Sequence, residues 1–326
     1  MSHHNIKHPL ISVVIPTYNR SRGLIRTLES VISQTIDEIE IVIVDDGSTD
    51  DTLQFIKSID DPRIHLLNLS RNSGGPAIPM SIGVNHSKAP IIAFLDHDDV
   101  AWPQWLEVLY GVVKSDPRIG MTWGTMRIVD DMRRVISVAY RNPFRHGRAE
   151  TLLPTMLTWT PGTSSLLVRR EVFDAIGNFD ERMGPVADLD FTFRFAYSGR
   201  WSIRISSVCV ADHHVHTRNL SSQLTDSYLT SMLNFVDKHS DCLSKIPSVK
   251  AEYLYRASRL SFSRKENRCG WHYLVMAVRT FPFHGRALAF AFFKILFLER
   301  AWCAISVFLA ERAARRRKRE AERLVG

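Results

Sequence analysis

The chain of 326 residues is long enough for one large α/β domain with an additional segment, and its 45% hydrophobic and 23% charged residues are ordinary for a globular protein. Its four cysteines lie far apart with no metal-ligand spacing, which argues against a disulfide framework or a zinc site and favours a reduced chain. The formal charge of +8 predicts an anionic partner: nucleic acid, a phosphorylated substrate or a lipid surface. The first ten residues lack the apolar core of a signal peptide, and we expect residues 1–9 to be disordered.

Residues 10–100 alternate predicted strands and helices. Runs of apolar residues predict strands at 11–16, 39–44, 64–69 and from 91, and the strands at 39–44 and from 91 are expected to be buried. Helices are predicted between them, and the expected N-caps are Asn19 or Ser21 for the first helix and Ser48 or Thr49 for the second. Because right-handed crossovers join such strands, we predict an α/β fold with a doubly wound, mostly parallel sheet and helices on both faces.

The following residues, 101–223, are less regular. The predicted helices cover 102–114, 171–176 and 188–197, and the predicted strands cover 120–128, 164–168 and 201–208. The Arg-rich residues 130–148 are predicted to form a loop. The last strand leads to His213, His214 and His216, and we interpret the first two as structural because no Cys, Glu or Asp is spaced to complete a zinc shell.

From residue 224 the composition changes to successive helices, which predicts a helical extension over residues 224–326. Residues 287–309 contain only three charges, but each would cost roughly 2.5–3.5 kcal/mol at the centre of a bilayer, so a membrane span is disfavoured. The basic run 315–319 follows, and an apolar helix beside a basic run is typical of an anchor on anionic lipid. The alternatives are a helix packed on a partner and an ordinary core helix with a solvated tail. We expect a cytoplasmic protein, either free or peripheral on the inner face of the cell membrane.

The stretch IIAFLDHDDV, residues 91–100, carries the strongest chemical signal. A buried strand runs directly into Asp96, Asp98 and Asp99 at its carboxyl end, the edge of an open α/β sheet where ligands bind. Carboxylates this close repel one another, so we expect a positive counter-charge, and their hard oxygens suit Mn²⁺ or Mg²⁺. The alternative is an acidic turn in which Asp98 or Asp99 caps the next helix.

Two earlier strands end in polar loops at the same predicted edge, PTYN at 16–19 and DDGS at 45–48. A nucleotide could lie there, with its base against these two loops and its diphosphate, through a metal, against the acidic cluster. Asp46 would then accept from a base N–H, and Tyr18 would stack on the ring. Each loop alone is a weak motif.

Together, these segments resemble the family 2 glycosyltransferases with the GT-A fold. The resemblance covers residues 10–222 and rests on segments in the family's order, among them ISVVIPTYNR, IEIVIVDDGSTDDT, NSGGPAI, IIAFLDHDD, ADLDFTFRFAYSGRW and VHTRNLSSQ. It implies a domain over residues 10–223, with a nucleotide-binding half at 10–100 and an acceptor half at 101–223. It also implies an inverting enzyme that moves a sugar from a nucleotide diphosphate donor, first of all a UDP-sugar, to an acceptor hydroxyl.

The resemblance assigns roles residue by residue. The donor-binding residues would be Pro16, Thr17, Tyr18, Asp46, Asn72 and Asp96. The ligands of Mn²⁺ or Mg²⁺ would be Asp98, Asp99 and His216. Asp188 would be the catalytic base, and we expect its helix N-terminus to lower its pKa so that it is ionised near neutral pH. Without the resemblance, Asp188 is interpreted as an N-cap.

The chain departs from the family pattern at two places. Ala187 stands where the family has a Glu before its catalytic Asp, which removes a neighbouring carboxylate. Pro79, Met80 and Ser81 stand where relatives often have Ala-Arg-Asn, so an Arg that commonly holds the donor is missing unless Arg71 or Arg20 replaces it. The second departure bears on the identity of the donor more than on the reaction.

Other functions match the sequence less well. A sugar-phosphate nucleotidyltransferase needs a Gly-rich phosphate loop after the first strand, and a dehydrogenase needs GxGxxG there. A nucleic-acid-binding module would explain the charge but not the carboxylates, and no nucleic acid is expected. A catalytically impaired relative that only binds a nucleotide-sugar remains an alternative. The expected acceptor is a glycan or a lipid-linked intermediate of surface polysaccharide or glycoconjugate synthesis, bound around residues 159–165 and 180–190.

Overall fold

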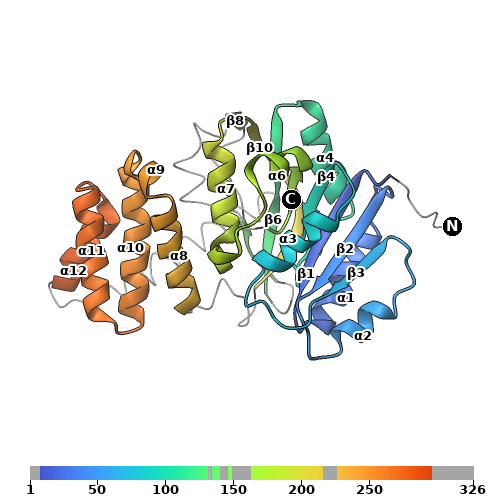
Figure 1. The fold of residues 1–326 in the computed structure, drawn as a ribbon, viewed down its shortest axis with the longest axis horizontal. Helices are drawn as coiled ribbons and strands as arrows, with labels where there is room; N and C mark the ends of the chain where they lie inside the picture. Colours follow the sequence, from blue (N-terminus) through green and yellow to red (C-terminus); the bar gives the residue numbers. More distant parts are fainter. Residues whose placement is uncertain are drawn as a thin grey trace. The chain divides into compact units, whose positions relative to one another are not determined.

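The computed structural model describes residues 8–130, 132, 134–139, 146–148, 163–215 and 226–295. The chain divides into two compact units, residues 1–216 and 217–326, which are described separately below. The first unit contains the sheet and its helices, and the second is helical (Figure 1).

The described part of the first unit is built on a ten-stranded sheet. Its strand order is β3 (Ile64–Asn68), β2 (Ile39–Asp45), β1 (Ile11–Thr17), β4 (Ile91–Phe94), β9 (Leu166–Arg169), β6 (Ile119–Val129), β10 (Ser202–His214) and β5 (Val100–Ala101), with β7 (Val135–Ala139) beside β6 and β8 (His146–Arg148) beside β10. The parallel neighbours are β1, β2, β3 and β4. Every residue of β1, β2 and β4 is buried, as continuous apolar runs between two helical layers require. The strands predicted for residues 10–100 are therefore confirmed, as are the helices between them, α1 (Ser21–Ile32), α2 (Thr52–Lys57) and α3 (Ala77–His86).

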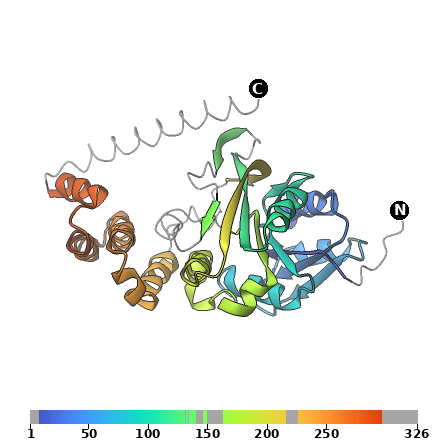
Figure 2. The same cartoon turned by 90° about the horizontal axis from the view of Figure 1, so that it is seen from above.

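Helices cover both faces of this sheet (Figure 2). On one face, α1 and α4 (Trp105–Ser115) bury Leu24, Leu28 and Trp105 in a core cluster with odd-numbered side chains of β1 and β2. On the other face, α3 lies so close that a Cβ added at Gly83 would come within 2.3 Å of Val14. The predicted α/β class with helices on both faces is confirmed.

The second half of the sheet is mixed. Its remaining elements are β5 (Val100–Ala101), β6 (Ile119–Val129), β7 (Val135–Ala139), β8 (His146–Arg148), β9 (Leu166–Arg169), α6 (Arg170–Ile176), the 3₁₀ helix η1 (Glu181–Val186), α7 (Ala187–Tyr197) and β10 (Ser202–His214). β9 runs antiparallel between β4 and β6. The residues just before β9 therefore lie beside the carboxyl end of β4, where the acidic cluster begins.

Two predictions for this half are wrong. The loop expected over residues 130–148 contains β7 and β8, because backbone pairing with β6 and β10 overrides the polar composition. The strand expected to end at Val208 continues as β10 to His214. Register shifts between Ile205 and Ala211 interrupt the alternation of side chains, which hides this continuation in the sequence.

The described part of the second unit consists of α8 (Asp226–Lys238), α9 (Ser240–Ser244), α10 (Pro247–Ser263), α11 (Asn267–Thr280) and α12 (Gly285–Ile295). Ala251, Leu254, Leu274 and Phe290 belong to the apolar cluster that joins α10, α11 and α12. The buried Glu252 of α10 accepts from Arg256 and from His284 before α12, both at 3.0 Å. Within residues 8–295, excluding the gaps, no helix combines the length and the apolar character needed to cross a membrane.

Candidate active site

The loops that follow β1 and β2 are bonded to each other. The fully buried Asp45 accepts from the Ser48 amide at 3.0 Å and from its hydroxyl, and the Ser48 hydroxyl also accepts from the Asn19 amide at 2.9 Å. Asn19, in a left-handed backbone conformation with φ +48°, accepts from the Thr49 amide at 2.8 Å. The predicted N-caps are therefore wrong: α1 and α2 begin after Arg20 and Asp51 without a side-chain cap. The side chains of Asn19, Ser48 and Thr49 bond within and between the two loops instead.

Asp46 orders the loop between β3 and α3. Its carboxylate accepts from the Asn72 side-chain amide at 3.0 Å and from the Ser73 amide and hydroxyl at 2.9 Å each. Burial raises the pKa of Asp46 despite these hydrogen bonds. Two of the predicted donor residues, Asp46 and Asn72, are thus in direct contact. The close approach of the loops after β2 and β3 needs Gly47, at φ +71°, because a Cβ there would lie 2.5 Å from the Arg71 carbonyl carbon.

The predicted residues Pro16, Thr17 and Tyr18 lie at the carboxyl end of β1. The Thr17 carbonyl accepts from the Asp46 amide at 2.8 Å, so this loop lies against that of β2. Thr17 Oγ1 is buried and finds no hydrogen-bond partner among the described residues. A buried hydroxyl in that state is costly unless a ligand supplies its partner. Tyr18 is 39% exposed, so its ring is accessible.

Asp96 and Asp98 lie at the carboxyl end of β4. Asp96 accepts from the Thr163 hydroxyl at 3.2 Å, and its amide donates to Ser164 Oγ at 3.1 Å. Burial, followed by the charges of Asp99 and Asp98, raises the pKa of Asp96 to about 7. Asp98 pairs with Arg20 at 3.4 Å. The counter-charge predicted for this cluster is therefore present as Arg20, which the sequence indicated only as a possible replacement for the missing donor-holding Arg.

Asp99 is fully buried and connects β4 to β10. It accepts from Ser164 Oγ at 2.5 Å, from His213 Nδ1 at 3.0 Å and from the His214 amide at 3.0 Å. Burial disfavours the charged His213 ring, but the hydrogen bond and charge of Asp99 outweigh it and raise the pKa of His213 to about 9. The interpretation of His213 as a structural histidine agrees with this contact. Neither this contact nor that of Ser164 was foreseen, because the partners lie 114 and 65 residues from Asp99 in the sequence.

Asp188 lies in the first turn of α7 and is partly exposed. Its Oδ1 accepts from the Leu189 amide at 2.8 Å. The expectation that the helix N-terminus lowers its pKa is wrong: burial dominates over the hydrogen bonds from Leu189 and its own amide, and raises the pKa of Asp188 to about 6.

The start of α7 lies near the carboxyl ends of the parallel strands. A Cβ added at Gly75, in the loop that Asp46 orders, would lie 3.8 Å from Gly184, four residues before Asp188. One turn after Asp188, Phe191 contacts Phe179 with ring centroids 4.9 Å apart, and Phe179 contacts Phe94 of β4 at 5.5 Å. The helix that carries Asp188 thus packs, through Phe179, on the strand that leads to Asp96.

Comparison with known proteins identifies this arrangement. The model of the family "Glycosyl transferase family 2" matches residues 12–177, about half of the chain. The chain belongs to glycosyltransferase family 2. It is therefore a glycosyltransferase, as the sequence predicted.

Relatives of this glycosyltransferase include an uncharacterized glycosyltransferase of Rickettsia prowazekii, 27% identical over 248 residues, or 74% of each chain. The chondroitin synthase of Escherichia coli is 26% identical over 247 residues, which cover 75% of this chain but only 34% of the synthase. Among solved structures, S. aureus TarS 1–349 in complex with UDP-GlcNAc has a TM-score of 0.63 at 20% identity, covering 83% of this chain and 81% of the TarS 1–349 chain. That likeness supports the GT-A fold predicted from the sequence.

The two departures of this glycosyltransferase from the family pattern are core positions. Ala187 is 1% exposed at the start of α7, and Met80 is 1% exposed in α3. Arg20, one of the two residues considered as a replacement for the missing Arg, pairs with Asp98.

The binding of Mn²⁺ or Mg²⁺ by Asp98, Asp99 and His216 stays a prediction. The described residues contain no group of three or more His, Cys, Asp or Glu side chains placed to hold a metal ion. His216 lies outside the described residues, as do residues 159–162 of the expected acceptor pocket.

Proposed function

We propose that this glycosyltransferase moves a sugar from a UDP-sugar to an acceptor hydroxyl by a single displacement that inverts the anomeric carbon. The supporting observation is that two sets of carboxyl groups are linked through β4, the second by way of Phe179. The cluster of Asp96 and Asp98 lies at the end of β4, and Asp188 begins a helix that packs on the same strand.

The loops of β1, β2 and β3 are proposed to hold the nucleoside. Thr17 offers a buried hydroxyl that lacks a partner among the described residues, and Tyr18 offers an exposed ring. Asp46 acts by ordering the loop with Asn72 and Ser73. The TarS structures that contain UDP or UDP-GlcNAc support a uridine nucleotide as donor.

Asp96 and Asp98 are the proposed site of a divalent cation. Burial, and after it the charges of Asp99 and Asp98, make the Asp96 anion costly, and hard oxygen ligands suit Mn²⁺ or Mg²⁺. We propose Asp98 as the principal ligand, with Asp96 beside it and His216 as a further candidate. The oxygens of Asp99 already accept from Ser164, His213 and His214, so Asp99 would act mainly by fixing this turn. When bound, the cation would supply positive charge for the leaving diphosphate.

Asp188 is proposed as the general base. Its carboxylate removes the proton of the acceptor hydroxyl while that oxygen forms a bond to the anomeric carbon and the bond to the diphosphate oxygen breaks. With a pKa of about 6, Asp188 is ionised at neutral pH and is a stronger base than an ordinary exposed carboxylate.

The proposed acceptor is a polysaccharide or a lipid-linked glycan. One relative is a chondroitin synthase, which supports a polysaccharide product. In the second unit, α11, α12 and the turn between them expose apolar side chains, among them Trp271, Val275, Phe283 and Phe292. Residues 264–295 carry six Lys or Arg against one Glu, which complements an anionic membrane surface.

The test is a comparison of Asp188→Asn and Asp98→Asn with the parent protein. A panel of UDP-sugars is screened for metal-dependent release of UDP, and calorimetry measures UDP binding with Mn²⁺ and with EDTA. We expect Asp188→Asn to bind UDP as the parent does while turnover falls by roughly 10²–10⁴-fold. Asp98→Asn should lose the effect of Mn²⁺ on UDP binding.

Each outcome tests a different part of the proposal: the base, the transferase activity or the cation. Parental turnover in Asp188→Asn would exclude this residue as the base. UDP binding with no turnover of any panel sugar in the parent would favour the catalytically impaired relative considered above. UDP binding that EDTA leaves unchanged would exclude the cation from donor binding.

A further inference from the structure

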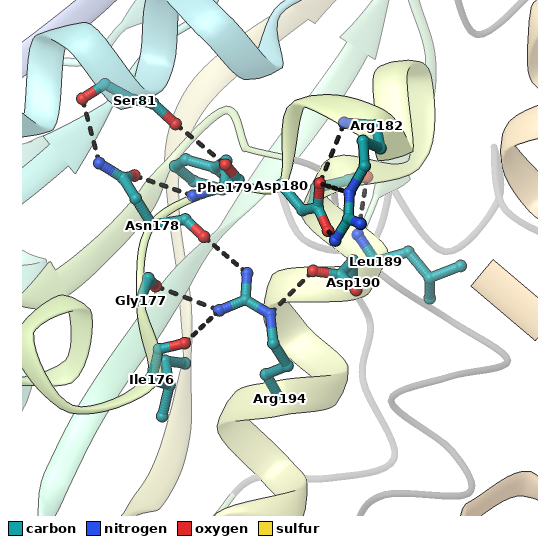
Figure 3. A network of polar contacts seen from close by, with 11 residues as sticks. Ser81, Ile176, Gly177, Asn178, Phe179, Asp180, Arg182, Leu189, Asp190 and Arg194 are labelled. Carbon is teal, nitrogen blue, oxygen red and sulfur yellow. Dashed lines mark hydrogen bonds and ion pairs between the residues drawn. The ribbon is translucent and has the colours of Figure 1, made fainter. Parts of the chain in front are cut away.

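Arg194, two turns into α7, donates to four different acceptors (Figure 3). Its Nε donates to Asp190 Oδ2 at 2.8 Å. Nη1 donates to the carbonyls of Ile176 at 2.5 Å and Gly177 at 3.1 Å, and Nη2 donates to the carbonyl of Asn178 at 2.8 Å. Asp190 is fully buried, and the Arg194 side chain is 18% exposed. One guanidinium therefore connects α7 to three successive carbonyls at the end of α6.

These carbonyls belong to a helix terminus, where backbone oxygens lack partners within the helix. α6 ends at Ile176, and Gly177 with φ +81° turns the chain away. Arg194 satisfies the exposed carbonyls in place of a continuing helix. A buried carboxylate such as Asp190 is costly and is tolerated only when it is paired and hydrogen-bonded, which Arg194 provides. The pair thus fixes the first two turns of α7 to the end of α6.

The same turn is attached to α3. The Asn178 side-chain amide donates to the Ser81 carbonyl at 3.1 Å, and the Ser81 hydroxyl donates to the Phe179 carbonyl at 3.2 Å (Figure 3). The same amide donates to Asn85 Oδ1 at 3.1 Å. The loop that Asp46 orders leads directly into α3, and hydrogen bonds connect α3 through the turn after α6 to α7.

We propose that Asp190 and Arg194 are positioning residues that hold Asp188 at the angle and depth needed for proton removal. The inference rests on the proposed role of Asp188 as the base. Asp190 follows Asp188 by two positions, so the two side chains point to different sides of α7, and Asp190 acts on the backbone of this turn rather than on the substrate. No sequence motif reveals these hydrogen bonds of Arg194, because its partners are backbone carbonyls 16–18 residues away.

The experiment compares Asp190→Asn, Arg194→Lys and the double variant with the parent. Turnover is measured as UDP release from UDP-N-acetylglucosamine, or from the panel sugar that is hydrolysed fastest, and UDP affinity is measured with Mn²⁺. We expect each single variant to lower kcat about ten- to hundred-fold, since a displacement near 1 Å costs that much, while UDP affinity changes less than twofold. Because both residues act as one unit, the double variant should lose no more than the worse single variant.

Arg118→Lys is the matched control. Arg118 also donates to an Asp two positions away, Asp116, but it precedes β6 at the amino edge of the sheet and its side chain is 80% exposed. It should keep parental turnover. If Arg194→Lys fails to fold, Asn178→Ala loosens the same turn from α3 without touching the Asp190–Arg194 pair, and it should show the same selective loss of kcat.

The outcomes distinguish the two levels of the proposal. An inactive Asp188→Asn together with parental kcat in Arg194→Lys and Asp190→Asn would overturn the positioning role alone. Additive losses in the double variant, or losses of kcat and UDP affinity in equal proportion with a lowered melting temperature, would also overturn it, because they indicate general destabilisation. Parental turnover in Asp188→Asn would instead reject the proposed base.

Discussion

At the scale of single residues, Asp188 is subject to opposing influences. Its place in the first turn of a helix favours the anion, whereas its burial disfavours it. Burial dominates, and the pKa therefore rises from an ordinary value near 3.8 to about 6. If Asp188 is the base, turnover should rise through about pH 6 and level off above it. The rate of UDP release against pH checks this, and a rise centred near pH 4 would contradict the raised pKa.

The same shift predicts an effect on stability. Since the pKa of Asp188 is higher in the folded protein than in the unfolded chain, folding favours the protonated form. Its contribution to stability is complete below about pH 4 and is lost as pH rises through about 6. Asp188→Asn should therefore melt at a higher temperature than the parent at pH 7.5, with the difference shrinking toward pH 4. Thermal melts at both pH values measure this, and a variant less stable than the parent at pH 7.5 would contradict it.

At the scale of elements, the site depends on the close approach of the loop after β2 to the loop after β3. Gly47 permits the approach, at φ +71° and with no room for a Cβ beside Arg71. Gly47→Ala should cost about 1–3 kcal/mol of unfolding free energy and weaken UDP binding, because the Asp46 contacts with Ser73 would be lost. Urea denaturation and calorimetry measure the two effects.

Gly111→Ala is the control for that substitution. Gly111 is exposed within α4, and a Cβ there meets nothing within 4 Å. The same chemical change should be neutral or stabilise the protein by up to about 1 kcal/mol. Equal effects of the two substitutions would show that the loop approach does not determine the stability of the site.

At the scale of the whole molecule, the proposed membrane contact predicts sedimentation of the full chain with vesicles of phosphatidylglycerol and phosphatidylcholine, but not with phosphatidylcholine alone. Binding should weaken with salt, since each basic side chain near an anionic surface contributes about 1 kcal/mol. Trp271→Gln with Phe283→Gln should lower the bound fraction. Met132→Gln, at a residue 75% exposed in the first unit, should not. Equal binding to both vesicle types would reject the anionic surface as partner.

The sequence by itself determined the parallel half of the sheet, the order of its helices and the three loops that gather at its carboxyl edge. These follow from hydrophobic periodicity and from the rule that parallel strands present their ends together, and both are local or topological properties. The family resemblance added the enzyme class and Asp188.

Only the tertiary structure decided how those residues are held. It placed His213 and Ser164 on Asp99, Arg20 on Asp98 and three backbone carbonyls on Arg194, and it reversed the direction expected for the pKa of Asp188. The physical reason is that burial and hydrogen bonding between distant segments depend on packing. Packing leaves no periodic signal in the sequence, because the partners are brought together by the fold and not by their spacing.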